Sequence, residues 1–159
     1  KFPTFVRLDR QATLNFVSKT TMKDVSLGYR FLKKSKSPKK NLLIIGHGTI
    51  IGRALDAYKK LSKIQKRKVD IIDLIRSKPF PKQFKNRINK YKNIITIDEQ
   101  TSEGSLGSLI MENCDLYTKH IECMSLPDKF IFENFGRAKL LDKNGLSVSN
   151  IINKIKKLI

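Results

Sequence analysis

The chain has 159 residues, of which 40% are hydrophobic, so it is long enough for one domain with its own core and too short for two ordinary domains. No run approaches the roughly 20 apolar residues that cross a bilayer, and the first residues lack the order of a signal peptide. These features predict a cytoplasmic protein without a membrane-spanning segment. In that compartment Cys114 and Cys123 are expected to be reduced and buried.

The charge is strongly basic, with 33 Lys and Arg against 14 Asp and Glu and a net charge of +19. Such a charge can attract nucleic-acid phosphates. The basic residues are spread through every segment, however, and no helix-turn-helix, zinc-finger or ribonucleoprotein motif accompanies them. The sequence therefore favours a solvated basic surface over a nucleic-acid interface.

The first 32 residues predict two extended segments around a linker. Residues 3–11, PTFVRLDRQ, are rich in β-branched and aromatic side chains, which favour a strand. Residues 12–23 have no firm period and are typical of a linker. A second strand is predicted over 27–32, before the polar, proline-containing break KKSKSPKK.

From residue 41 on, buried strands alternate with helices. The predicted strands are 41–45, 69–74, 93–97 and 120–124, and the predicted helices begin at Thr49, Lys82, Gly104 and Ser147. Thr49 and Ser147 are expected to cap their helices. Continuous apolar strands separated by helices are typical of parallel sheets with right-handed crossovers. The sequence therefore predicts an open α/β domain.

A glycine-rich turn, GHGTIIG from Gly46 to Gly52, follows the first of these strands. In this setting glycines can let the backbone approach a pyrophosphate at a helix amino terminus, and Asp73 lies where a ribose-binding group would be expected. The spacing differs from the usual dinucleotide fingerprint. The turn predicts either nucleotide binding or close packing of helix against strand.

Other polar residues give no self-contained active site. His47 and His120 have no Cys, His or carboxylate at metal-ligand spacing, so no metal site is predicted. The carboxylates Asp98, Glu99 and Glu103 are expected in loops or helix caps rather than as an acid/base pair. No catalytic residue is assigned.

Two arginines, Arg7 and Arg10, lie in the first extended segment. Their planar guanidinium groups suit bidentate binding of phosphate or carboxylate. They could equally form ion pairs at the surface or between domains, and the residues alone leave both possibilities open.

Four stretches together resemble the carboxyl-terminal domain of the transketolase family, which includes the 1-deoxyxylulose-5-phosphate synthases. They are NLLIIGHGTIIGRAL, VDIIDLIRSKPF, IITIDEQTSEGSLGSLIMEN and LPDKFIFENFGRAKLLDKNGLSVSNII, in the family's order and spacing. The resemblance implies a three-layer α/β domain with an open sheet of about five strands, mostly parallel with one antiparallel. It places residues 1–22 at the end of a preceding pyrimidine-type domain with its linker, and residues 23–159 in the transketolase C-terminal-like domain.

The resemblance also implies a cofactor outside this chain. Family members use thiamine diphosphate and magnesium, held through a G-D-G motif, a downstream Asn and a Glu, and this sequence contains no such set. The chain is therefore expected to bind no cofactor and to be inactive alone, as a fragment or the smaller product of a split gene. Its expected partners are the remaining transketolase domains or subunit, in a homodimer that acts on a phosphosugar.

One residue carries over from the family by position. Leu8-Asp9-Arg10-Gln11 resembles the S-R-Q stretch of transketolases and the R-Y-P-R-G stretch of the synthases, in which the second arginine binds the sugar phosphate. Arg10 is the matching residue and Arg7 a supporting one. Asp9 departs from the family's Ser or Pro and would partly neutralise the site if it faced inward. The resemblance thus favours an enzyme part that transfers a two-carbon ketol unit between phosphosugars; the alternatives are a nucleotide-binding regulatory module and a basic nucleic-acid binder.

Overall fold

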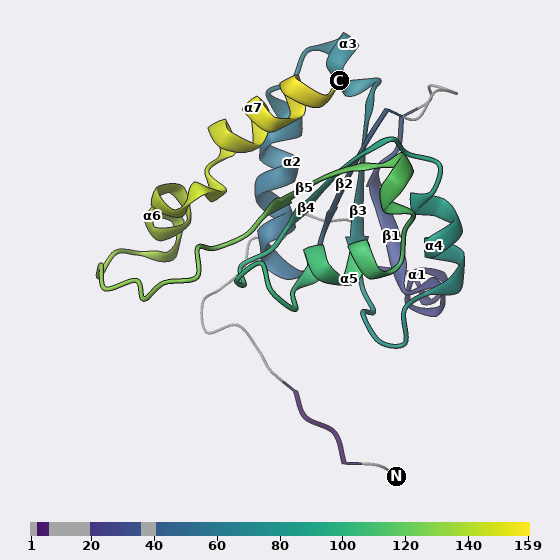
Figure 1. Cartoon of the computed structure of the whole chain (residues 1–159), viewed down its shortest axis with the longest axis horizontal. Coiled ribbons are helices and arrows are strands. Elements are labelled where there is room, and N and C mark those ends of the chain that lie inside the picture. The colour runs from purple at the N-terminus through teal and green to yellow at the C-terminus, as the bar shows by residue number, and fades with distance from the viewer. Residues whose placement is uncertain (1–2, 7–19, 36–40) are drawn as a thin grey trace.

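The computed structural model describes residues 3–6, 20–35 and 41–159 and contains one five-stranded sheet (Figure 1). The strands are β1 (Tyr29–Lys33), β2 (Leu42–Gly46), β3 (Val69–Leu74), β4 (Asn93–Ile97) and β5 (His120–Met124). Their order in the sheet is β1-β3-β2-β4-β5, with β1 antiparallel to β3 and all other pairs parallel. The predicted mixed sheet is confirmed.

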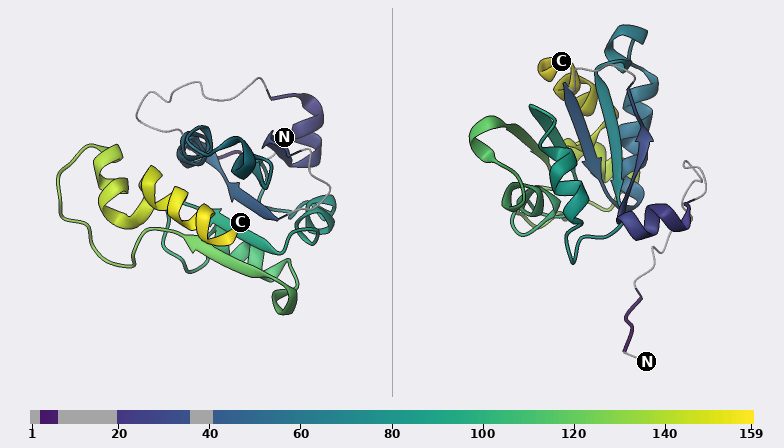
Figure 2. Two further views of the ribbon diagram at one scale, coloured as in Figure 1. Left: turned by 90° about the horizontal axis from the view of Figure 1, so that it is seen from above. Right: turned by 90° about the vertical axis from the view of Figure 1, so that its right-hand side faces the viewer.

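Seven α-helices and three further helical turns accompany the strands in the described residues. They are α1 (Met22–Leu27), η1 (Gly48–Ile50), α2 (Ile51–Lys59), α3 (Lys63–Lys66), α4 (Lys82–Ile88), α5 (Leu106–Glu112), η2 (Leu116–Thr118), α6 (Arg137–Leu141), η3 (Asp142–Leu146) and α7 (Val148–Leu158). The views in Figure 2 show helices on both faces of the sheet.

The core consists of two apolar layers, one on each face of the sheet. Successive side chains of β2 alternate between them, because side chains along a strand point to opposite faces. Leu42 and Ile44 pack with α2 and α7, whereas Leu43 and Ile45 pack with α4 and α5. All four are fully buried, which explains why β2 is continuously apolar.

The amino-terminal part differs from the sequence prediction. Residues 3–6 form no strand, and residues 7–11 of the predicted strand lie outside the described residues. The end of the predicted linker starts α1 instead, because Thr21 and Asp24 form a reciprocal capping box. Leu27 consequently belongs to α1, and the strand begins only at Tyr29.

Two local predictions beyond residue 41 are wrong. Thr49 does not cap α2, because it lies inside the turn η1, where its hydroxyl accepts a hydrogen bond from Arg137. Cys123 is exposed rather than buried, since β5 is an edge strand, and Cys114 is half-buried; both thiols are free. Ser147 does cap α7, accepting a hydrogen bond from the Asn150 N–H.

A buried carboxylate in β3 is hydrogen-bonded to one residue that follows β1 and to one that precedes β4. Asp70 is 1% exposed and accepts hydrogen bonds from the Tyr91 hydroxyl and the backbone N–H of Ser35. Burial is the main cause that raises the pKa of Tyr91, and the bond to Asp70 adds to it.

No helix in the described part of the chain is long and apolar enough to cross a membrane.

Candidate functional site

The candidate site lies at the carboxyl edge of the parallel strands, where β2 and β4 are neighbours. Gly46 of β2 is in register with both Asp73 of β3 and Ile97 of β4, so the residues that follow these strands converge. From β2 the chain passes to α2 on one face, and from β4 it passes to α5 on the other. This is a topological switch point, the usual position of ligand sites in open α/β sheets.

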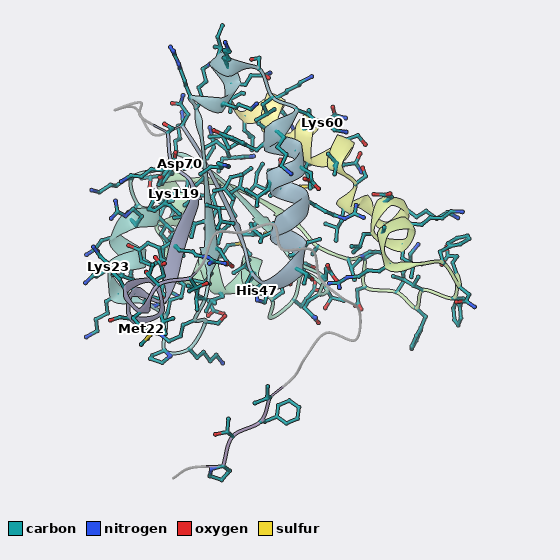
Figure 3. All side chains as sticks on the ribbon, turned by 180° about the vertical axis from the view of Figure 1, so that it is seen from behind. Met22, Lys23, His47, Lys60, Asp70 and Lys119 are labelled. Atoms are coloured by element: carbon teal, nitrogen blue, oxygen red, sulfur yellow. The ribbon has the colours of Figure 1, made fainter. Side chains whose placement is uncertain are left out.

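His47 and Asp98 meet across this switch point. The Nε2 of His47 lies 3.1 Å from Oδ1 of Asp98, although 51 positions separate the two residues. The second oxygen of Asp98 accepts the backbone N–H of Leu106 at the start of α5. Figure 3 shows His47 beside the start of α2, whereas Asp70 lies toward the other end of the sheet. The pair thus links the loops after β2 and β4.

The charges around His47 favour its protonated form. The hydrogen bond to Asp98 raises the pKa of His47, burial opposes this, and the charges of Asp98, Asp73 and Glu99 add to the increase. Burial raises the pKa of Asp98, but hydrogen bonds from His47 and from the Leu106 N–H outweigh it and leave that pKa below its usual range. The imidazole side chain is 42% exposed, so it can exchange protons with solvent.

Asp73 has a partner of its own. Its carboxylate lies 2.9 Å from a guanidinium nitrogen of Arg30, and both side chains are largely buried. Burial raises the pKa of Asp73, and Arg30 only partly offsets that effect. Because Arg30 belongs to β1, this ion pair fixes the antiparallel edge strand to β3 rather than leaving a carboxylate for a ribose.

Arg137 links α6 to the loops at the carboxyl ends of β2 and β4. Its guanidinium contacts Glu99, with Nε donating at 3.1 Å and Nη2 at 2.8 Å to the same oxygen, and Nη2 also donates to the Thr49 hydroxyl. Glu99 is the second residue after β4, and Arg137 is the first residue of α6. The first turn after β2, the loop after β4 and α6 therefore share one polar cluster.

The glycine turn has a packing role at Gly46. A Cβ at this position would lie 2.6 Å from Cδ1 of Ile51 and 2.9 Å from Cγ2 of Ile97. Gly48 has φ +64°, a backbone conformation that favours glycine, and no atom lies within 4 Å of a Cβ built there. Of the two predictions for this turn, the structure supports close packing of helix against strand, and it gives no support to nucleotide binding.

The described residues do not fit thiamine diphosphate with magnesium. The three carboxylates closest to the switch point, Asp73, Asp98 and Glu99, each have a cationic partner in the chain. No group of three or more His, Cys, Asp and Glu within the described ranges could hold a metal ion. No chemical step through this cofactor can be derived from the residues of this chain.

The arginines predicted from the sequence cannot be placed at the edge. Arg7 and Arg10 both lie outside the described residues. Conversely, sequence reasoning missed the contacts of His47, Arg30 and Arg137. One signal could have found the first of them: His47 and Asp98 directly follow neighbouring parallel strands and must therefore come close. Arg30 and Arg137 carried no comparable signal, because ion pairs between distant segments leave no periodic pattern.

The structure is a three-layer α/β domain whose polar groups are paired at the carboxyl edge of the parallel strands. Comparison with known families gives its class: residues 33–151 match the family model "Transketolase, C-terminal domain". The chain belongs to the transketolase C-terminal domain family.

Two curated relatives show how much of a longer protein this chain resembles. The 1-deoxy-D-xylulose-5-phosphate synthase of Bacillus velezensis is 35% identical over 126 residues, which are 77% of this chain and 20% of the relative. The enzyme of the same name from Geobacillus sp. is 28% identical over 99% of this chain and 25% of its own length. The chain thus spans about a fifth to a quarter of these relatives.

The solved structures agree on the fold. A split-gene transketolase, described as an inactive tetramer of beta chains (beta4), superimposes with a TM-score of 0.70 at 22% identity. The match covers 89% of this chain and 46% of that one. At this identity the likeness establishes the shared fold of the two domains.

Proposed function

We propose that this chain is the carboxyl-terminal domain, or the smaller subunit of a split pair, of a cytoplasmic thiamine-diphosphate-dependent transketolase-like enzyme. The observation that carries the proposal is the family match over residues 33–151 in a chain that spans only 20% of a curated relative. The proposed boundary lies near residue 22, with residues 1–22 belonging to the end of the pyrimidine-type domain and its linker.

The proposed reaction is transfer of a two-carbon ketol unit between phosphosugars. The names of the relatives support a phosphorylated sugar, since one group forms 1-deoxy-D-xylulose 5-phosphate and the other comprises transketolases. The higher identity to the synthases, 35% against 22% for the split-gene transketolase, favours a second candidate, formation of 1-deoxy-D-xylulose 5-phosphate. Assays of the complete enzyme that detect either transfer of a ketol unit between phosphosugars or formation of 1-deoxy-D-xylulose 5-phosphate distinguish the two.

The proposed role of this domain is structural, supporting the dimer of the complete enzyme, and we expect no activity from the isolated chain. The polar groups at the switch point are engaged with one another, as in the pairs His47–Asp98, Arg30–Asp73 and Arg137–Glu99. They therefore offer little for a cofactor diphosphate. The split-gene transketolase that shares the fold is itself described as an inactive tetramer.

Within the complete enzyme we propose that Arg10 binds the phosphate of the sugar and that Arg7 supports it. A guanidinium group can donate two parallel hydrogen bonds to phosphate, which fixes orientation as well as affinity. Replacing Arg10 by Ala in the complete enzyme should raise KM for a phosphorylated donor far more than for a non-phosphorylated one. Equal effects on both donors would argue against a phosphate contact.

Calorimetry on the isolated chain tests the assignment against nucleotide binding. Thiamine diphosphate, ATP and NAD are titrated separately into the chain, and we expect no saturable heat from any of them. Micromolar binding of ATP or NAD that is lost in Gly48→Val would instead identify a nucleotide-binding module. Tight binding of thiamine diphosphate would refute the view that the cofactor site lies elsewhere.

A further inference from the structure

The loop between β5 and α6, residues 127–136, exposes two aromatic rings. Phe130 and Phe132 are 86% and 88% exposed, and their ring centroids lie 6.0 Å apart. In an extended chain, side chains two positions apart point to the same side, as those of Phe130 and Phe132 do. Figure 1 shows this segment running outward from the sheet before it returns to α6. The pair forms a small apolar surface that nothing in the described residues covers.

Both ends of this aromatic loop are fixed to the same place. At its start the backbone N–H of Leu126 donates to the carbonyl of Gln100 at 2.8 Å. At its end Arg137 binds Glu99, the residue before Gln100. The rings are therefore presented from a base anchored beside the loop after β4, which reduces the ordering cost of docking.

A second set of contacts holds the helix that follows the loop. Arg53 of α2 donates to the backbone carbonyls of Leu146 and Ala138 at 2.9 and 2.8 Å, and it also binds the carboxylate of Asp142. Arg53 is only 15% exposed in its side chain. The loop is thus flanked by a helix that the rest of the domain keeps in place.

The charge around the aromatic loop is mixed with a small positive excess, because Asp128 and Glu133 within the loop are outnumbered by Lys129, Lys139 and Lys143. Phe135 lies under two ammonium groups, those of Lys139 and Lys143, each 4.2 Å from the ring centroid. The whole chain carries a net charge of +19. Two copies of so basic a chain repel each other, whereas a partner surface with carboxylates would attract it.

We propose that the aromatic loop is the docking surface for the catalytic part of the same enzyme, inserting Phe130 and Phe132 into an apolar pocket rimmed by carboxylates. This inference rests on the proposed function, since it takes the partner to be the portion that the relatives have and this chain does not cover. Aromatic anchors at the centre of a charged rim are the usual source of binding energy in such interfaces.

The test measures access to the loop in the complete enzyme, or in the complex with the partner subunit if that is encoded separately. Cys114 and Cys123 are first replaced by Ser, and a single thiol is then introduced by Phe132→Cys. The matched control is Tyr117→Cys, because Tyr117 is also a fully exposed aromatic residue but lies before β5. The rate of maleimide labelling is compared between the isolated chain and the assembled enzyme.

We expect the Phe132→Cys variant to react at least tenfold more slowly in the assembled enzyme than in the isolated chain, with Tyr117→Cys unchanged. Phe130→Ser/Phe132→Ser should weaken assembly at least tenfold while leaving the melting temperature of the isolated chain unaltered. Unchanged labelling in an assembled enzyme would overturn the docking site but leave the proposed function intact. Failure of the chain to assemble would overturn both. Protection that develops in the isolated chain as its concentration rises would identify a second copy as the occupant and overturn the inference.

Discussion

His47 and Asp98 form a hydrogen-bonded pair, 3.1 Å between Nε2 and Oδ1, that ties the loop after β2 to the loop after β4. The pair spans the point where the chain diverges to opposite faces of the sheet. Because this bond raises the pKa of His47, the link should make stability depend on pH.

His47→Gln should reduce that dependence. The pKa of His47 is raised in the folded state, so its contribution is complete below the unfolded value of about 6.5 and is lost as pH rises through the folded value. The free energy of unfolding should therefore fall from pH 6 toward pH 9, by at most about 1 kcal/mol because the ring is partly exposed. Urea titrations should show this decline in the wild type and in His120→Gln, which removes the other histidine, but not in His47→Gln. A decline retained in His47→Gln would place the titrating group elsewhere.

Gly46→Ala tests the packing role of the glycine turn. The added methyl group would lie 2.6 Å from Ile51 and 2.9 Å from Ile97, and overpacking of this kind costs about 1–3 kcal/mol. Gly136→Ala is the control, since its φ is −64° and nothing lies within 4 Å of the new Cβ, so its cost should stay below about 1 kcal/mol. Equal stability of both variants in chemical denaturation would contradict the close approach at Gly46.

Tyr91→Phe removes the hydroxyl that donates to the buried Asp70 carboxylate. Leaving a buried charged acceptor with one partner fewer costs about 1–3 kcal/mol. Thermal and urea unfolding should both register the loss. The control is Tyr117→Phe, which deletes a hydroxyl from a fully exposed side chain and should leave the free energy of unfolding unchanged. If Tyr91→Phe is as stable as this control, the bond to Asp70 contributes nothing to stability.

A double-mutant cycle on Arg137 and Glu99 measures how firmly α6 is attached to the loop after β4. The paired side chains are 30% and 24% exposed, so we expect a coupling energy of about 1 kcal/mol. Arg137→Lys should recover little of it, because an ammonium group cannot reproduce the two-nitrogen contact. Additive effects of Arg137→Ala and Glu99→Ala would mean that the ion pair does not hold the helix.

Much of the fold was predictable because burial leaves a direct trace in the sequence. The strands at 69–74 and 93–97 have the predicted bounds, since strands covered on both faces are mostly apolar; the polar residues in them, Asp70, Asp73 and Thr96, are buried as well. The apolar residues Phe84 and Ile88, four positions apart in α4, are both fully buried.

The missed elements depend on contacts between distant residues. The helices α1, α3 and α6 have only four to six residues, too few for a helical period to show. Local caps fix α1 and α3, through Thr21 and Ser62, whereas α6 relies on Arg53 and Arg137. The candidate site was missed for the same reason, because His47 forms its hydrogen bond with Asp98, a carboxylate 51 positions away in the chain.

The most direct test of the proposed function compares product formation by the isolated chain with that by the complete enzyme, at saturating thiamine diphosphate, magnesium and phosphorylated substrates. We predict no turnover above background for the isolated chain at any concentration, and cofactor-dependent formation of a phosphosugar when the remaining domains or subunit are present. Cofactor-dependent turnover by this chain alone would contradict the account.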